Sequence, residues 1–203
     1  MPASQNPNAW NNWYHAVGST YGTWLRGDPR GFRTFQHRQH VQGDYRNPPP
    51  PGIYAPIFEK SKTELRYPPV QLNTRQRHIA CRAMIEKLRE DAVEIIALAI
   101  MSNHLHLLAR FPPMSADQQQ RYAKSILQDG RDPAPRHFLG RARKHASFEL
   151  SKLKLKPPSP VWGARPKIDP TRDRQHQVNI TAYIRNHLNQ GGAVYLTKHG
   201  FLF

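Results

Sequence analysis

The chain has 203 residues, of which 38% are hydrophobic and 10% aromatic, so it is long enough for one domain with a core. A formal net charge of +16 favours nucleic acid as the partner, and no apolar run is long enough to span a bilayer. The single cysteine, Cys81, excludes an intramolecular disulfide framework and a thiolate zinc cluster.

The first part of the chain is predicted to contain a strand, an insertion and a helix. Residues 14–25 are rich in aromatic, β-branched and small residues, which favours a strand, and a Gly/Pro/Arg turn follows. Residues 33–72 hold the run PPPPG and further prolines, so we expect an irregular Pro-rich insertion over the surface. Apolar residues recur at helical spacing over 74–91, with Asn73 or Thr74 as the N-cap.

Two adjacent strands and three helices are predicted after that. The apolar run VEIIALAIM and the segment HLHLLARF are typical of strands, and Ser102-Asn103 separates them. We expect a polar helix over 115–128, a basic helix over 136–154, and a last helix over 174–189 that a Gly-Gly pair ends. A short strand or loop, VWGARPKI, precedes this last helix, and a strand, GAVYL, follows it. This order predicts a single α+β domain in which an antiparallel sheet carries helices.

His104 and His106 lie two residues apart in a predicted strand. Strand side chains alternate between faces, so both imidazoles leave the same face and can share one divalent metal. With 11 histidines in the chain, about 0.6 such pairs arise by chance, so the spacing alone says little. Their position in an apolar strand is stronger evidence for a metal site. Imidazoles that bind no metal there must be hydrogen-bonded or exposed.

Tyr183 and His187 lie four residues apart on the last predicted helix, so they face the same way. A phenol beside a metal-polarised phosphodiester can attack phosphorus and form a covalent phosphotyrosine. His187 would be a third metal ligand or would assist proton transfer. The other interpretation of a tyrosine on an amphipathic helix is a core or interface aromatic.

Three segments resemble one protein family. The segment IMSNHLHLL at 100–108 resembles the central HUH strand of single-tyrosine insertion-sequence transposases and REP-associated tyrosine transposases, and YIRNH at 183–187 resembles their catalytic helix. The opening TYGTWL with GDPRG is similar to the start of some members. Ser102 stands where proline is common in the family, and His187 stands where Gln or Asn is common. Tyr195 and Tyr122 are the alternative nucleophiles if the helix register differs.

The resemblance implies a fold, a reaction and a partner. The fold would be a ferredoxin-like antiparallel sheet with packed helices, and Mg²⁺ or Mn²⁺ would be held by His104, His106 and His187. Tyr183 would attack a phosphate of single-stranded DNA at a hairpin, leaving a 5′-phosphotyrosine and a free 3′-hydroxyl, and reversal would transfer the strand. We expect a cytoplasmic, nucleoid-associated protein of bacterial type, because the polar start lacks a signal-peptide pattern. Whether it forms a homodimer is left open.

Basic and aromatic residues outside the motif are candidates for DNA contact. Glu149 is the only acid between Arg136 and Lys156, which favours phosphate tracking over a merely solvated helix face. The candidates are Arg136, Arg141, Arg143, Lys144 and Lys152 on the basic helix, and Arg26, Arg30 and Arg33 in the early turn. Trp10, Trp13 and Trp24 are candidates for stacking on unpaired bases, although Trp24 fits the core equally well.

Two rival functions remain at the level of sequence. One is a non-cleaving module that binds single-stranded nucleic-acid hairpins, including a transposase descendant that has lost cleavage. The other is a metal-dependent phosphoesterase without a tyrosine intermediate, which usually needs two separate histidine motifs, and only one convincing pair is present.

Overall fold

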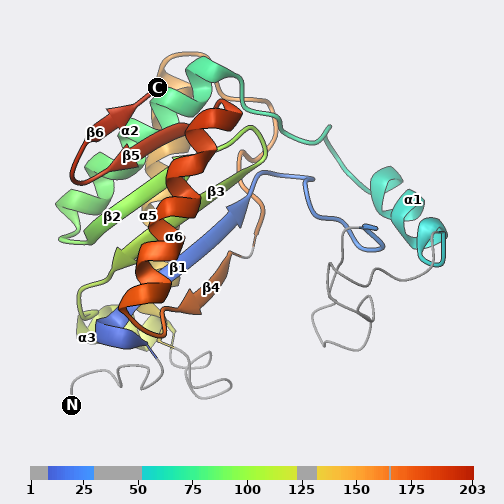
Figure 1. Cartoon of the computed structure of the whole chain (residues 1–203). Coiled ribbons are helices and arrows are strands. Elements are labelled where there is room, and N and C mark those ends of the chain that lie inside the picture. Colours follow the sequence, from blue (N-terminus) through green and yellow to red (C-terminus); the bar gives the residue numbers. More distant parts are fainter. Residues whose placement is uncertain (1–8, 30–51, 123–131, 165) are drawn as a thin grey trace.

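Apolar residues dominate the central strands, β2 and β3, of the six-stranded antiparallel sheet of the domain (Figure 1). The computed structural model describes residues 9–29, 52–122, 132–164 and 166–203. The strands lie in the order β4-β1-β3-β2-β5-β6. Their bounds are β1 Trp13–Ser19, β2 Glu94–Ile100, β3 His104–Arg110, β4 Lys167–Pro170, β5 Ala193–Leu196 and β6 Gly200–Leu202.

The connections between these strands identify the fold class. The helices are α1 (Ala55–Thr63), α2 (Thr74–Glu90), α3 (Ala116–Arg121), α5 (Ala134–Lys152) and α6 (Arg174–Asn186), with short 3-10 turns η1 (Trp10–Asn12) and η2 (His187–Gln190). Helix α2 lies between β1 and β2, and α5 lies between β3 and β4. The four strands are arranged β4-β1-β3-β2 and all pair antiparallel, which is the ferredoxin-like arrangement. The predicted α+β class is therefore confirmed, and β5 and β6 extend the sheet at the β2 edge.

The two faces of the sheet carry different helices. Helices α2 and α5 pack together on one face, with Leu105, Leu107 and Ala109 of β3 in the shared core. Helix α6 crosses the other face, and its Ile180 and Ile184 pack with β2, β3 and β5 (Figure 1). Leu108, between Leu107 and Ala109, belongs to the cluster on the α6 face, as the strand period requires.

Local sequence explains why α2 begins where it does. The Asn73 side chain accepts a hydrogen bond from the Gln76 backbone N–H, and the Gln76 side chain accepts from the Asn73 backbone N–H in return. This capping box satisfies two backbone donors that the first helical turn leaves unpaired. Cys81 is buried in this helix, and burial raises the pKa of its thiol to about 12, so it is a core residue.

The segment predicted to be an irregular insertion is partly ordered. Residues 30–51 lie outside the described part, but α1 occupies residues 55–63, and Val70 and Leu72 are buried in the core. The expectation of irregular chain therefore does not hold for these residues. Val70 N–H donates to the Tyr21 carbonyl at 2.9 Å, so this segment is fastened to the turn after β1.

Three further boundaries differ from those predicted. The first strand ends at Ser19 rather than at residue 25, because a turn begins there. The polar helix is α3, which ends at Arg121, and residues 123–131 lie outside the described part. The tail after GAVYL forms β6, which the sequence did not predict, and it pairs with β5. Over the described residues, no helix is both long and apolar enough to cross a membrane.

Gly27 allows α1 to approach the turn after β1, and its replacement tests this packing. Gly27 has a φ of +80°, and a Cβ there would lie 2.4 Å from the Phe58 backbone nitrogen. We expect Gly27→Ala to loosen α1 and to cost about 1 kcal/mol or more of the free energy of unfolding. Limited proteolysis within 55–63 and urea unfolding measure the two effects.

Gly140→Ala is the control for this variant. A Cβ at Gly140 meets nothing within 4 Å, and the position lies inside α5, so we expect stabilisation by about 0.5–1 kcal/mol. A Gly27→Ala protein as resistant to protease as wild type would contradict the docking of α1.

Candidate metal and nucleophile site

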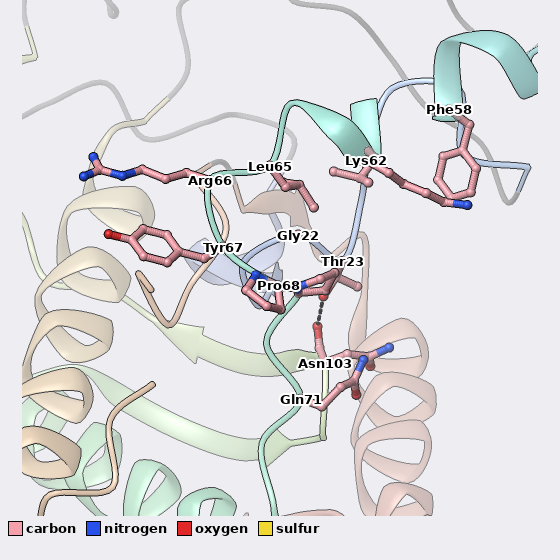
Figure 2. A pocket seen from close by; sticks show the side chains of 12 residues that line it. Gly22, Thr23, Phe58, Lys62, Leu65, Arg66, Tyr67, Pro68, Gln71 and Asn103 are labelled. Atoms are coloured by element: carbon pink, nitrogen blue, oxygen red, sulfur yellow. Dashed lines mark hydrogen bonds between the residues drawn. The ribbon is translucent and has the colours of Figure 1, made fainter. Parts of the chain in front are cut away.

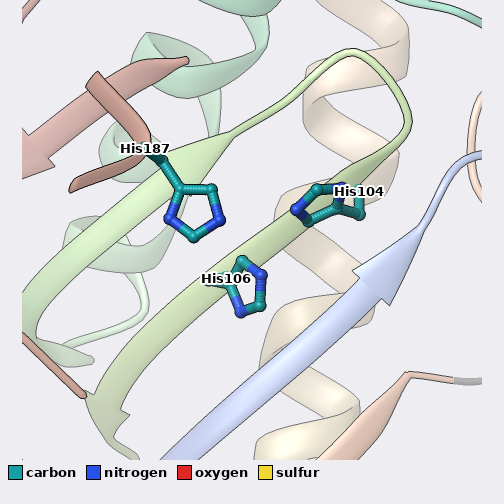
Figure 3. A group of neighbouring side chains, drawn as sticks. All are labelled: His104, His106 and His187. Atoms are coloured by element: carbon teal, nitrogen blue, oxygen red, sulfur yellow. The ribbon is translucent and has the colours of Figure 1, made fainter. Parts of the chain in front are cut away.

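Three imidazoles converge on the α6 face of the sheet. His104 and His106 stand on β3, and His187 stands where α6 ends (Figure 3). One ring nitrogen from each lies within 4.8 Å of the others. Two nitrogens on opposite sides of one ion lie about 4.2 Å apart. The three rings are therefore close to ligand spacing and can hold a metal ion.

The chain after α6 fixes the position of His187. Gly191 adopts the left-handed conformation that ends the helical segment, with a φ of +75°. Gly192 donates its backbone N–H to the His187 carbonyl at 2.9 Å, and a Cβ on Gly192 would lie 2.8 Å from that same oxygen. The Gly-Gly pair is thus needed both to end the helix and to let β5 start beside His187.

Each of the three imidazoles has a partner on its Nδ1 atom. His104 Nδ1 donates to the Asn103 side-chain oxygen at 2.7 Å, and His187 Nδ1 donates to the Tyr183 carbonyl at 3.0 Å. His106 Nδ1 lies 3.0 Å from His15 Nε2. For His104 and His187 the partner is an oxygen, so these bonds select the tautomer that leaves Nε2 with its lone pair, which is the form that binds a metal. His106 has the same tautomer when its Nδ1–H donates to His15.

His15 is a member of the site that sequence reasoning missed. It lies on β1, and its ring stacks on that of His106 with centroids 5.2 Å apart. In the antiparallel register its Cα pairs with that of Asp169 on β4. Alternation along β1 places His15 on the α6 face, so a strand prediction for this segment could have indicated it. The pairing of β1 with β3, which brings it to His106, could not be inferred from the chain alone.

Burial favours the neutral forms of His15, His104 and His106. Desolvation, together with the neighbouring histidines, lowers the pKa of His106 to about 2. Desolvation also lowers the pKa of His15 to about 4, although Asp169 acts in the opposite direction, and it lowers the pKa of His104. Imidazole binds metal only when it is unprotonated, so this environment favours a cation over protons at neutral pH.

Tyr183 lies at the entrance to the three imidazoles. Its ring centroid is 4.8 Å from that of His187 and 5.1 Å from that of His106, and both contacts are edge-on. Tyr183 is 52% exposed. The helix that carries it is packed against the sheet through Ile180 and Ile184. A core role for this tyrosine is therefore excluded, and Tyr183 is open to solvent beside His106 and His187.

The two alternative tyrosines lie elsewhere. Tyr195 is buried in the cluster on the α2 face, and its hydroxyl accepts from Arg89 at 2.6 Å. Tyr122 packs against the same cluster, and its hydroxyl lies 3.4 Å from His137 Nδ1. Neither of them is brought to the three imidazoles.

A cavity of about 590 Å³ lies next to the histidine site (Figure 2). The turn after β1 and the segment from α1 to residue 71 line it, and it reaches Asn103. The Thr23 hydroxyl donates to the Asn103 carbonyl at 3.2 Å, which holds the turn against the start of β3. Since the Asn103 side chain also orients His104, this contact links the turn after β1 to the candidate metal ligands.

The predicted DNA-binding residues on α5 do not surround the histidine site. Helix α5 lies on the opposite face of the sheet from α6, so its Arg136 and Lys144 are exposed far from the imidazoles. Arg141 pairs with Asp91 at 2.8 Å, and Lys152 pairs with Glu149 at 3.1 Å.

Arg143 is a correction to the predicted DNA contacts. It is only 8% exposed, donates to the Gly163 carbonyl and lies over the Trp162 ring, so it is a structural residue and not a phosphate contact. Desolvation lowers its pKa to about 10. Arg26 and Trp24 are exposed in the early turn, whereas Arg30 and Arg33 lie outside the described residues.

Two solved structures are similar to this chain. A REP-associated tyrosine transposase bound to a REP hairpin shares 14% identity, with a TM-score of 0.42 over 94% of this chain and 75% of that one. A protein of Deinococcus radiodurans R1 assigned as a transposase shares 13% identity, with a TM-score of 0.31 over 86% of this chain and 88% of that one. No protein-family model and no curated protein matches the chain.

A variant at His15 tests the neutral, buried state of the site through pH. A histidine with a pKa of about 4 when folded and about 6.5 when unfolded stabilises the fold fully above pH 6.5. Its contribution falls by up to about 1.4 kcal/mol per pH unit as the pH drops towards 4. We expect His15→Gln to remove this pH dependence, so that the free energy of unfolding falls less steeply between pH 6.5 and 4 than in wild type. Urea unfolding in the presence of a chelator measures it.

The exposed histidine His199 provides the matched control, because His199→Gln makes the same change outside the site. If the wild type, His15→Gln and His199→Gln all lose stability equally between pH 6.5 and 4.5, His15 is not buried as a neutral imidazole.

Proposed function

We propose that the protein is a metal-dependent single-stranded DNA endonuclease and strand transferase, a transposase of the HUH tyrosine type. The observation that carries this proposal is the exposed Tyr183 beside three imidazoles that can share one ion. A surplus of 16 positive charges supports a polyanionic substrate. Likeness to a hairpin-bound transposase points the same way, without fixing the substrate.

In this proposal the chain's own residues position and carry out a transesterification. A divalent cation bound by His104, His106 and His187 would supply positive charge to a non-bridging oxygen of the scissile phosphate. The Tyr183 oxygen attacks phosphorus and forms the new P–O bond, and the bond from phosphorus to the 3′ oxygen breaks. The phenol loses one proton and the leaving 3′ oxygen gains one, so the number of P–O bonds and of protons is unchanged. Attack by another 3′-hydroxyl on the 5′-phosphotyrosine reverses it and transfers the strand.

The DNA hairpin would contact basic residues beyond the site. Arg26 stands in the exposed turn near the cavity that reaches Asn103, so it is placed to approach a strand there. Arg136 and Lys144 face away from the sheet on α5, where only a duplex stem that wraps the domain would reach them. Arg30 and Arg33 keep their predicted role as phosphate contacts.

The first test is the covalent adduct. Incubation with Mn²⁺ and single-stranded hairpins labelled at either end is expected to give protein carrying the downstream 3′ label on a denaturing gel. Tyr183→Phe removes the attacking oxygen, so we expect the adduct to be lost by more than about a thousandfold while hairpin binding is retained.

Tyr122→Phe is the control, because it deletes the same hydroxyl away from the imidazoles. Equal adduct from Tyr183→Phe and wild type would refute the proposal. Tight hairpin binding without any adduct, over several substrates, would instead favour the non-cleaving binding module.

The ligand chemistry predicts which ion works better. Three imidazoles without a carboxylate suit Mn²⁺ better than Mg²⁺, which prefers oxygen ligands. We expect adduct formation in Mn²⁺ to exceed that in Mg²⁺ by about tenfold or more at equal concentration. His187→Gln, which supplies an amide oxygen, is expected to narrow this ratio, and calorimetry should show Mn²⁺ binding weakened by about 10- to 100-fold. An unchanged ratio would remove His187 from the ligand set.

A further inference from the structure

A second, larger cavity lies on the side of α6 away from the three imidazoles. It has a volume of about 930 Å³ and is enclosed by η1, the start of β2, α6 and the turn after β5. Volumes of this size hold small organic ligands. Nothing in the reaction at Tyr183 uses this space.

The cavity carries more positive than negative charge. Arg174, Arg185 and Lys198 line it, and all three are exposed. The single acid among its lining residues, Glu94, is already paired, because its carboxylate accepts from Arg110 Nε at 2.8 Å. Arg174 and Arg185 lie about three turns apart on α6, and Lys198 follows β5, so the cations are spread along the cavity. The net charge therefore favours an anion with more than one phosphate.

Aromatic and aliphatic side chains supply the apolar part of the cavity. Trp10 is half-buried in η1, where its backbone N–H donates to the Thr171 carbonyl at 2.7 Å. Trp13 is 7% exposed, and its ring lies 5.5 Å from the Arg110 guanidinium. Leu196 and the exposed Val178 complete the apolar surface. An indole beside cations is the combination with which proteins hold an unpaired base and its phosphate.

The helix places this cavity close to the proposed reaction. With 3.6 residues per turn, Arg185 points roughly 200° away from Tyr183 on the same helix, and Val178 and Thr181 point with Arg185. A helix with its side chains is about 10–12 Å across, so a strand that leaves Tyr183 needs to cross one helix width to reach the cavity.

We propose that this cavity binds a short unpaired stretch of the DNA strand, with one base against Trp10 near the start of α6 and phosphates at Lys198 and at Arg185 near its end. The proposal rests on the proposed function, since it names the binding subsite of the same single strand. DNA bound in the cavity would also contact α6 on the side away from the imidazoles. It would therefore restrict the motion of Tyr183, which lies on the same helix.

The test measures binding in the absence of cleavage. The probe is a fluorescein-labelled DNA hairpin with a single-stranded overhang, and fluorescence anisotropy gives its Kd over a range of salt in the presence of EDTA. Trp10→Ala is expected to weaken binding by about 5- to 150-fold, the loss of one stacked base. Arg185→Ala is expected to reduce the slope of log Kd against log salt by about 0.7, the value for one phosphate contact on a single strand.

Arg75→Ala is the matched control, because it removes the same charge from an exposed position on α2. It should leave the slope as in wild type. Should Trp10→Ala unfold, which circular dichroism would show, the salt slope of Arg185→Ala alone decides the question.

The outcomes separate this proposal from the one about cleavage. A wild-type slope and Kd for both cavity variants overturn the subsite, even where the Tyr183 adduct forms normally. Altered binding without any adduct supports the subsite and contradicts cleavage. A wild-type dimer in sedimentation that Trp10→Ala dissociates, with DNA affinity unchanged, would mean that the cavity holds a second copy of the chain instead.

Discussion

The alternation of side chains along β3 determines what this domain can do. β3 pairs with β1 on one side and β2 on the other, so it lies inside the sheet and not at an edge. Leu105, Leu107 and Ala109 form part of the core with α2 and α5. His104 and His106 must then project from the opposite face, where α6 lies. The alternation that places the leucines in the core thus places two imidazoles side by side on the other face.

Placing histidines on a largely buried face has a physical cost that the neighbouring elements offset. An unpaired polar group in such a setting would destabilise the fold by about 1–3 kcal/mol. Each Nδ1 has a partner, from Asn103, from the Tyr183 carbonyl or from His15. One hydrogen bond per ring is therefore satisfied within the protein, and the second nitrogen is left for a ligand. The partner of His187 is the backbone of the proposed nucleophile itself, so the orientation of this ring depends on α6.

The parts of the fold that follow from local patterns could be predicted from the sequence. The helical spacing and capping residues of α2, the two central strands and the glycines after α6 all depend on neighbouring residues in the chain. The candidate site residues could be predicted for the same reason. His104 and His106 share β3, and Tyr183 and His187 share the end of α6. That a His187 ring nitrogen comes within 4.8 Å of those of His104 and His106 depends on tertiary packing, which the sequence indicated only through the family resemblance.

Other features depended on long-range packing and were missed. His15 joins the site through the register between β1 and β3, which brings together residues 91 positions apart. Arg143 was predicted to contact DNA because it lies in a basic helix. Its spacing from Leu139 and Ala146 places it on the buried side of α5, and this periodicity could have corrected the prediction. That α5 lies across the sheet from the imidazoles followed only from the completed topology.

The central claim, that one ion is shared by the three imidazoles beside Tyr183, is tested most directly by anomalous X-ray scattering from crystals grown with Mn²⁺. We expect one strong peak about 2.2 Å from Nε2 of His104, His106 and His187, with the Tyr183 phenol directed towards it. A peak bonded to other residues, or the absence of a peak between these rings in crystals saturated with Mn²⁺, would contradict it.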